Sequence, residues 1–506
     1  MSIPILSAEA LRAVESKADQ SGLSYAEMME RAGTALAERL AQLLAESGAP
    51  QDLWRVTFLV GPGNNGGDGL VAGRQLAAAT GAGVRFYLLK ARAEDDLHLQ
   101  TAQAAGLQIA LASDDQRFRV LQQMVSTSLI VVDALFGIGA RAPFDASTRK
   151  LLKSVTTALN ANEPEPPPFE FASEPARLRS GRARVLAVDC PSGLDCDTGA
   201  IDEAALCADE TMTMIAAKPG LFRFPGAAFV GRLSVASLGV APATEGPTQA
   251  QQHLVTSADV AAWLPERAPD GHKGTYGRVL IVGGSANYTG APALAARAAY
   301  RMGAGLVTVG APAPLVDTLA ANLYEATWLH LPHDLGALVE DGAGLIRQEA
   351  PRCDALVMGM GMGREPGTHR FLADLLAGSG TRTHAPIGFT ASAPTESSSK
   401  PDLAPLVIDA DALSMLADLP DWPSLLPPGT ILTPHPGEMA RLCGLSTQEV
   451  IEQRWELART KAADWGVTLV LKGAHTLIAS PDGTVLVLPF KTSALATAGT
   501  GDVLAG

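Results

Sequence analysis

Short apolar segments alternate along the first half of the chain with longer stretches in which apolar residues recur at helical spacing. Two helical stretches, 7–19 and 24–45, precede the first apolar segment. Strand patterns separated by helix patterns predict a parallel sheet with helices on both faces. Ligands of such sheets bind at the carboxyl ends of the strands. The predicted strands of this half are 54–60, 84–89, 129–135, 184–188, 211–216 and 232–238.

The same alternation starts again after a polar stretch, 241–252, which is rich in Pro, Thr and Gln. This stretch predicts a linker between two domains, residues 1–240 and residues 253–506. Two other stretches, 161–180 and 378–403, lack periodicity and are predicted to be surface loops. We therefore expect an α/β protein with two three-layer α/β/α domains. The predicted strands of the second half are 278–283, 306–309, 355–358, 406–409, 431–433, 469–471 and 485–488.

Composition narrows the classes of function. Hydrophobic residues make up 47% of the chain and charged residues 18%, which is typical of globular domains. The net charge of −14 and the lack of a Lys/Arg run argue against nucleic acid as a partner. No apolar run approaches the ~20 residues of a membrane-spanning helix, and the N-terminus does not resemble a signal peptide. The five cysteines are scattered without metal-binding spacing, which predicts a reduced protein in the cytoplasm.

The first candidate site begins with GPGNNGGDG, residues 61–69, between a predicted strand and a predicted helix. Its glycines and the helix start suit a phosphate, although a tight βα turn explains the same residues. Asp133 and Asp189 each close an apolar strand, so the parallel sheet brings them together. Clustered carboxylates need a cation or a proton between them, and oxygen-rich surroundings suit an alkali or other hard cation.

The glycine loop, VVDALFGIG and VDCPSGLD together resemble the NAD(P)H-hydrate epimerase domain, over residues 1–240. The resemblance implies a Rossmann-like fold, the damaged nucleotide NAD(P)HX as ligand and K⁺ as cofactor. It implies Asn65, Asp133 and Ser192 as the potassium ligands. It implies Asp189 as a nucleotide-contacting residue, which we take as the acid–base residue of epimerisation. The implied substrate contacts are Asn64, Asn65, Gly66, Gly67, Asp68, Gly137, Ile138, Gly139, Ala140, Arg141, Ala142, Pro143 and Asp189.

The second candidate site is centred on TAGTGDVLAG, residues 497–506, where two glycines precede an aspartate and a helix start. Glycine loops at helix starts bind phosphate, and Asp502 there serves either as an N-cap or as a catalytic base. Other loops at predicted strand ends are MGMGMGR (358–364), TPHPGE (433–438) and KGAHT (472–476). Oriented amide donors, a lysine and a base on one sheet are what phosphoryl transfer requires.

TYGRVLIVGG, TPHPGE, VLKG and GTGD together resemble ADP-dependent NAD(P)H-hydrate dehydratase, over residues 253–506. The resemblance implies a ribokinase-like fold and Mg²⁺ with ADP or ATP. Asp502 would then deprotonate the ring hydroxyl of the hydrate. The implied hydrate contacts are Ala293, Gly361, His435 and Asp502, and the implied nucleotide contacts are Lys472, Gly473, Ala474, His475, Thr476 and Gly501.

Together the two resemblances predict one bifunctional enzyme, an isomerase and a lyase, which acts as a homo-oligomer in nicotinamide-nucleotide repair. The first domain would interconvert R- and S-NAD(P)HX, and the second would dehydrate the S form to NAD(P)H. The alternative is a ribokinase-like small-molecule kinase with a non-catalytic nucleotide-binding N-terminal module. A stable phosphorylated alcohol would indicate the kinase, whereas free orthophosphate with restored NAD(P)H would indicate the dehydratase.

The last four residues raise a separate expectation. Only about one helical turn follows Asp502, and an isolated turn has little stability of its own. We therefore expect a second domain that is truncated at its C-terminus, with a frayed phosphate loop, no packing partner for the final turn and weak dehydratase activity.

Overall fold

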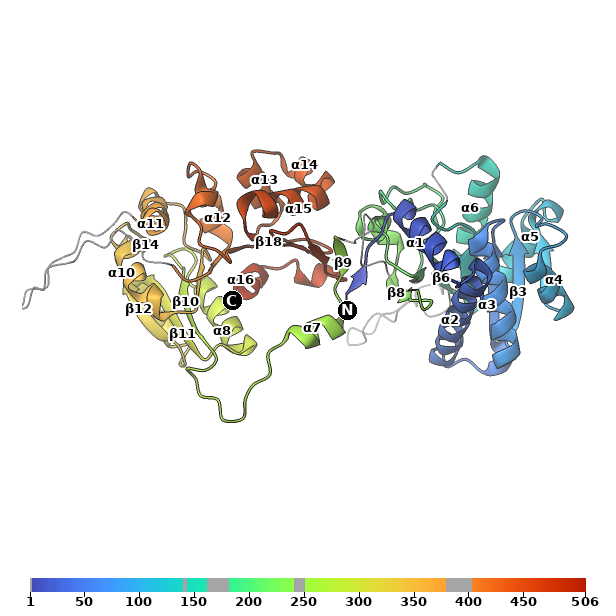
Figure 1. Cartoon of the computed structure of the whole chain (residues 1–506), viewed down its shortest axis with the longest axis horizontal. Coiled ribbons are helices and arrows are strands. Elements are labelled where there is room, and N and C mark those ends of the chain that lie inside the picture. Colours follow the sequence, from blue (N-terminus) through green and yellow to red (C-terminus); the bar gives the residue numbers. More distant parts are fainter. Residues whose placement is uncertain (1, 140–142, 162–181, 241–250, 379–402) are drawn as a thin grey trace, which may run out of the picture. The chain divides into compact units, whose positions relative to one another are not determined.

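The computed structural model describes residues 2–139, 143–161, 182–240, 251–378 and 403–506. These residues form two compact units, residues 3–250 and residues 251–506 together with residues 1–2 (Figure 1). Most of the predicted linker, 241–252, lies outside the described residues. The predicted loops 161–180 and 378–403 also lie almost wholly outside them. Each unit holds its own parallel sheet with helices packed on it, so the predicted α/β fold class is confirmed.

The sheet of the first unit is parallel throughout and has the order β4-β3-β2-β5-β6-β7-β8. Strand β4 was not among the predicted strands. The strands of this sheet are β2 (Arg55–Val60), β3 (Gly83–Leu88), β4 (Gln108–Leu111), β5 (Ile130–Ala134), β6 (Arg184–Val188), β7 (Glu210–Met214) and β8 (Arg232–Ala236), and a short strand outside it is β1 (Ile3–Pro4). The helices are α1 (Ala8–Gln20), α2 (Tyr25–Glu46), α3 (Asn64–Thr80), α4 (Leu97–Ala104), α5 (Arg119–Ser126) and α6 (Ala146–Asn160).

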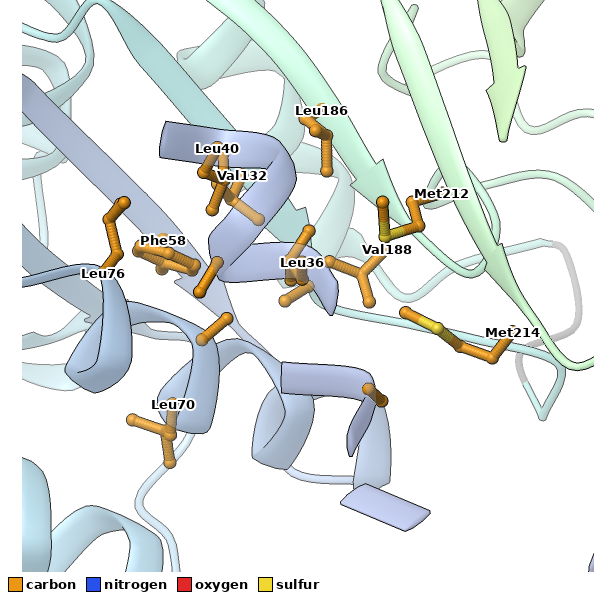
Figure 2. Packing of buried hydrophobic residues seen from close by; sticks show 14 of the residues in the cluster. Leu36, Leu40, Phe58, Leu70, Leu76, Val132, Leu186, Val188, Met212 and Met214 are labelled. Atoms are coloured by element: carbon orange, nitrogen blue, oxygen red, sulfur yellow. The ribbon is translucent and has the colours of Figure 1, made fainter. Parts of the chain in front are cut away.

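Two hydrophobic clusters cover opposite faces of this sheet. Phe58 of β2 packs with α2 and α3 on one face, and its neighbour Leu59 packs with α5 and α6 on the other. Successive side chains of a strand point to opposite faces, so a strand buried on both sides consists of apolar residues throughout. Figure 2 shows part of the first cluster, in which Leu40 of α2 lies beside Val132 and Leu36 beside Val188. The result is the expected three-layer arrangement.

The main sheet of the second unit has the order β9-β20-β19-β18-β17-β16-β15-β10-β11-β12. Neighbours from β18 to β12 are parallel, whereas β19 runs antiparallel between β18 and β20. The sequence prediction missed β9, β12 and β19, and also β13 and β14, which form a separate two-stranded sheet. The strands are β9 (Gln252–Leu254), β10 (Arg278–Val282), β11 (Leu306–Pro312), β12 (Thr327–Leu331), β13 (His333–Asp334), β14 (Ala337–Leu338), β15 (Ala355–Met358), β16 (Leu406–Ile408), β17 (Ile431–Leu432), β18 (Thr468–Leu471), β19 (Leu477–Ala479) and β20 (Val485–Val487).

Both faces of this sheet are also covered. Ile281 of β10 packs against α8 and α9, while its neighbours Leu280 and Val282 are equally buried on the opposite face. Figure 1 shows α13, α14 and α15 gathered beside β18. The helices are α7 (Ser257–Trp263), α8 (Ala291–Met302), α9 (Ala313–Ala320), α10 (Gly342–Glu349), α11 (Pro366–Ala377), α12 (Ala410–Leu416), α13 (Pro436–Cys443), α14 (Thr447–Glu452), α15 (Arg454–Trp465) and α16 (Thr500–Ala505).

The final helix corrects one expectation. Helix α16 forms over Thr500–Ala505 and packs against α8. Ala505 is only 5% exposed, and it belongs to the same hydrophobic cluster as Ala295 and Ala299 of α8. The expectation of a final turn without a packing partner was therefore wrong, because the first turns of α8 provide the apolar surface that covers it.

Candidate functional sites

A cavity of about 1170 Å³ lies at the carboxyl end of the first sheet. Its lining includes the segments that begin after β2, β5 and β6, together with residues of the two N-terminal helices and of the segments that follow β3, β7 and β8. The structure thus brings together residues that the sequence places far apart. Ala140, Arg141 and Ala142 lie outside the described residues, and Gly66 and Gly67 are buried beneath the lining. The predicted site residues that line the cavity are Asn64, Asn65, Asp68, Gly137, Ile138, Gly139, Pro143 and Asp189.

The glycines of the first loop divide into two groups. A Cβ atom on Gly66 would lie 2.1 Å from the Gly61 carbonyl oxygen, and one on Gly67 would lie 2.7 Å from the sulfur of Met29. These glycines let the first turn of α3 pack closely against the rest of the unit. A Cβ atom on Gly63 would meet no other atom within 4 Å. Of these three glycines, only Gly63 at the N-cap has open space where a side chain would stand.

Arg92 braces the same loop and was not identified from the sequence. Its Nη1 donates to the carbonyl oxygens of Gly61 (2.6 Å) and Gly63 (3.2 Å), and its Nε lies 2.5 Å from Asp96. A planar guanidinium can bind several acceptors at once. The orientation of the loop that precedes α3 is thus fixed by a residue beyond the next strand.

Asp133 and Ser192 form a buried polar pair. Asp133 accepts hydrogen bonds from the Ser192 backbone nitrogen (2.7 Å) and hydroxyl (2.6 Å), and both residues are almost fully buried. Burial raises the pKa of Asp133, although the bonds from Ser192 lower it. Asn65 is 8% exposed, and neither its Nδ2 nor its Oδ1 has a hydrogen-bond partner within the described residues. A buried amide oxygen without a donor fits a cation ligand, because such groups are otherwise paired.

Asp189 follows β6 in a left-handed backbone conformation with φ 67°. Its Oδ1 binds the ammonium of Lys218, and it also accepts from the Thr213 hydroxyl (3.2 Å) and the Met214 backbone nitrogen (3.3 Å). Its Oδ2 faces Gly137, since a Cβ atom added there would lie 3.2 Å from it. One carboxylate oxygen is therefore held by the protein, while the other faces the loop that lines the cavity.

Two further carboxyl groups, Glu15 of α1 and Asp68 of α3, lie near this pair and line the same cavity. Burial, followed by repulsion from Asp189, raises the pKa of both side chains, and that of Asp68 is raised well above its usual value. Lys218 acts in the opposite direction on both. Glu15 was not predicted, because on its amphipathic helix it resembles an ordinary solvated residue.

The cysteines differ from the sequence-based expectation. The structure joins Cys190 and Cys196 in a disulfide across the loop that carries Ser192, whereas their scattered positions predict thiols. The two sulfurs are adjacent because the loop folds back on itself over a separation of 6 residues. Cys207, Cys353 and Cys443 are free.

In the second unit, Lys472 is the centre of the candidate site. It follows β18, and its Nζ lies 2.7 Å from Asp409, which is 1% exposed and follows β16. A Cβ atom on Gly501 would lie 3.6 Å from both the Asp409 Oδ2 and the Lys472 Nζ. The predicted lysine segment and the terminal glycine loop therefore meet, and Asp409 joins them.

Carboxyl groups surround this lysine. Burial raises the pKa of Asp502, followed by repulsion from Asp409, whereas Lys472 lowers it. Burial likewise raises the pKa of Glu438 to about 7, which Lys472 opposes and Asp409 and Asp411 reinforce. A carboxylate with a raised pKa is a better proton acceptor. Asp502 thus meets a requirement for a base, and Glu438 is a second titratable group that the sequence did not reveal.

His435 is the N-cap of α13. Its Nδ1 accepts from the backbone nitrogens of Gly437 (3.0 Å) and Glu438 (3.2 Å), so the neutral ring carries its proton on Nε2. Burial, followed by repulsion from Lys472, lowers the pKa of His435. The ring therefore remains neutral near pH 7 and presents a donor beside the Lys472 cluster.

The segment 472–476 is held by the protein itself. Arg454 donates to the carbonyl oxygens of Ala474 (3.0 Å) and Lys472 (3.4 Å). His475 is 5% exposed, its backbone nitrogen donates to Phe490, and its Nδ1 lies 3.1 Å from the Leu488 oxygen. The His475 side chain therefore supports the segment from within the protein interior, while Lys472 extends toward the carboxylates.

The remaining predicted residues gather around the start of α8. A Cβ atom on Gly361, which has φ 63°, would lie 2.6 Å from Cβ of Tyr288 and 3.1 Å from that of Ala291. Ala293 lies on the first turns of the same helix. A Cβ atom on Gly499 would lie 2.9 Å from Leu294. The MGMGMGR loop and the terminal loop thus share α8 as a neighbour.

Within the described ranges, no group of three or more His, Cys, Asp or Glu side chains is placed to hold a metal ion. Mg²⁺ usually retains waters and binds through substrate phosphates with one or two carboxylates, which the Asp409–Asp502 region can supply. A search of the described helices found none with the length and apolar character needed to cross a bilayer.

Comparisons with known proteins agree with this division into two sites. The model of the family described as NAD(P)H-hydrate dehydratase matches residues 279–506, and that of the YjeF-related protein N-terminus matches residues 25–220. A relative from Moorella thermoacetica, named bifunctional NAD(P)H-hydrate repair enzyme Nnr, is 35% identical over 95% of this chain and 82% of its own. A relative from Salinibacter ruber with the same name is 33% identical over 99% of this chain and 86% of its own.

A solved structure is also similar to the second half of the chain. It is the ADP/ATP-dependent NAD(P)H-hydrate dehydratase from Bacillus subtilis, co-crystallised with ATP and Mg²⁺. The sequence identity is 31%, the match covers 49% of this chain and 77% of the other, and the TM-score is 0.39.

Proposed function

Because the chain belongs to the family of bifunctional NAD(P)H-hydrate repair enzymes, we infer that it restores hydrated NAD(P)H through an epimerase in its first half and a dehydratase in its second. We propose the domain limits 1–240 and 253–506 for these activities. The observation that carries the assignment is the convergence of three motifs on one cavity, with Asp189 and Asn65 beside Gly137.

Epimerisation needs a group that removes and returns a proton at the hydroxyl of the hydrate. A carbinolamine inverts when its hydroxyl loses a proton, the ring C–N bond opens with protonation at nitrogen, and the ring closes on the other face. Asp189 is placed to take that proton through Oδ2, since Oδ1 is already bound by Lys218 and Thr213. The cavity walls would hold the rest of the nucleotide.

Asn65, Asp133 and Ser192 would hold K⁺ beside this acid. The unpartnered Asn65 amide and the buried oxygens of Asp133 and Ser192 support that assignment. The cation would supply positive charge that stabilises ligand oxygens and the nearby carboxylates.

Dehydration in the second half would begin with phosphoryl transfer. Asp502 would take the proton of the ring hydroxyl while the hydroxyl oxygen attacks the terminal phosphorus of ADP or ATP. AMP or ADP would then leave. The existing bond between the ring carbon and the phosphorylated oxygen would then break with release of orthophosphate, and loss of a proton from the neighbouring carbon would restore the double bond. Lys472 and the amides at Gly501 would balance the charge on the phosphoryl group.

The test uses the full chain with a mixture of NADHX epimers, Mg²⁺ and ADP or ATP, and follows absorbance of the reduced nicotinamide. We expect complete recovery, with one epimer consumed at the dehydratase rate and the other at the epimerase rate. The Asp502→Asn variant should lose recovery but still interconvert the epimers. No recovery by the wild type, or a stable phosphorylated product, would refute the proposal. Cytoplasmic location and homo-oligomerisation stay predictions.

A further inference from the structure

Lys218 is the most buried cation of the first site. It follows β7, is 0% exposed and is among the largest fully buried side chains described. Lysine is almost never fully buried unless it is paired, because removing an ammonium from water is costly. A buried lysine beside a proposed acid–base residue therefore calls for an explanation.

Each donor of the Lys218 ammonium has a partner. Its Nζ binds the Asp189 Oδ1, the Thr213 hydroxyl (2.5 Å) and the Met214 carbonyl oxygen (3.2 Å). An ammonium has three N–H donors and no acceptor, so this set satisfies it completely. Thr213 in turn donates to the same Asp189 oxygen (3.2 Å). Lys218, Thr213 and Asp189 are thus hydrogen-bonded to one another in a triangle. Asp189 takes part in this triangle through Oδ1 and not through Oδ2.

The triangle determines which oxygen of Asp189 is exposed to the ligand. With Oδ1 held by Lys218 and Thr213, Oδ2 faces Gly137 and the cavity loop. The left-handed backbone of Asp189 directs the side chain away from its own strand, and its backbone nitrogen donates to Met212 (2.7 Å). Rotation of the carboxylate would break the contacts with Lys218, so the lysine fixes the orientation of the carboxylate.

The surrounding charges make the lysine necessary. Glu15 from α1 and Asp68 from α3 both interact with Asp189 by repulsion, and Lys218 is the cation that acts on both of them. Arg12, on the same helix as Glu15, acts on Glu15. Without Lys218 three neighbouring carboxyl groups would share one wall of the cavity without a buried counter-charge.

We propose that Lys218 is a positioning residue of the epimerase, which holds one oxygen of Asp189 so that the other accepts the proton of the substrate hydroxyl. The inference rests on the proposed role of Asp189 and extends it to a lysine outside the predicted motifs. We expect no contact between the substrate and Lys218, because this lysine is fully buried and does not line the cavity, whereas Asp189 does.

The experiment compares four full-length variants, Lys218→Met, Asp189→Asn, the double variant and Lys153→Met. Lys153 is an exposed lysine of the same unit that pairs with Glu203 at the surface, so it controls for loss of a charge. Rates of epimer interconversion are measured by chromatography, and fluorescence of Trp54, the only tryptophan before residue 251, reports whether the first unit is folded.

We expect Lys218→Met to lower kcat about 100-fold, the scale of general acid–base catalysis, with KM changed less than threefold. Because Lys218 acts through Asp189, the double variant should be no slower than Asp189→Asn alone. It should also be more stable than Lys218→Met, because it leaves no buried charge unpaired. The double variant therefore keeps the test valid if the single one folds poorly.

The outcomes separate the two proposals. If Asp189→Asn retains the wild-type rate, the proposed role of Asp189 is wrong. If Asp189→Asn is slow but Lys218→Met is as fast as Lys153→Met, only the inference about Lys218 is wrong. An additive loss in the double variant would also overturn it, since a lysine with a purely structural role would slow the Asp189→Asn enzyme further.

Discussion

The buried ring of His475 predicts a loss of stability in the second unit at acidic pH. Burial is the main cause that lowers the pKa of His475 from 6.5 to about 4, helped by Lys491 and Arg454 and opposed by Leu488. The unfolded chain therefore binds a proton near pH 6 that the folded chain does not. Stability from the neutral ring is fully present above pH 6.5 and is lost as pH falls toward 4.

The size of this effect follows from the difference in pKa. One pKa unit corresponds to about 1.4 kcal/mol, so protonation at pH 5 should lower the free energy of unfolding by about 2 kcal/mol. His475 is 5% exposed, so solvent screens the effect little. The bond from Nδ1 to the Leu488 oxygen favours the charged ring, so the loss comes from the buried charge and not from a broken hydrogen bond.

His475→Asn is the matched variant. Asparagine tolerates the φ of 52° at this position, and its amide can donate to the Leu488 oxygen, but it does not titrate. Urea unfolding followed by tryptophan fluorescence suits the test, because Trp54 is the only one of the six tryptophans that precedes residue 251. The wild type should lose about 2 kcal/mol more than the variant between pH 7.5 and pH 5. Equal losses would refute the argument that the buried ring causes the acid sensitivity.

Three further predictions concern the two sites. Glu438→Gln should stabilise the second unit more at pH 8 than at pH 5 in urea unfolding. The pKa of Glu438 is about 7 in the folded state and 4.5 in the unfolded state. The folded state therefore retains a proton that the unfolded state releases, so the free energy of unfolding of the wild type falls as pH rises from 4.5 to about 7. Gly137→Ala should slow epimerisation about tenfold or more, because its Cβ would lie 3.2 Å from the Asp189 Oδ2 and 3.4 Å from the Asn65 Oδ1. The dehydratase rate of the same protein should not change. Replacing K⁺ by a bulky organic cation should slow epimerisation in the wild type, whereas the Asn65→Ala variant, already slow, should be insensitive to the exchange.

The convergence of distant motifs was predictable from the sequence. Asp133 and Asp189 close apolar segments, and the carboxyl ends of parallel strands meet at one edge, so the cavity was expected where it lies. The structure gives two of the loop glycines a packing role that the sequence pattern did not indicate. The freedom of Gly66 and Gly67 serves packing against Gly61 and Met29, because glycine admits a neighbouring backbone as readily as a ligand.

The residues that the sequence missed act through tertiary contacts alone. Arg92 reaches back to carbonyl oxygens 31 and 29 positions earlier in the chain, and no local pattern marks it as a brace. Lys218 stands in IAAKPG just beyond β7, where its position at a strand end among apolar residues was the one available signal. Which carboxylate it neutralises depends on the order of strands in the sheet, since β6 and β7 are neighbours.

Each half of the chain contains a buried ion pair between a lysine and an aspartate at its candidate site. In each, a lysine that follows one strand neutralises a buried aspartate that follows another, Lys218 with Asp189 and Lys472 with Asp409. An opposite charge favours the charged form of the carboxylate that it binds, and a charged carboxylate raises the pKa of its neighbours. Those neighbours, Asp68 and Asp502, carry raised pKa values for this reason as well as burial. A buried ion pair adds little net stability, so its presence at both candidate sites is better explained by control of proton affinity than by folding.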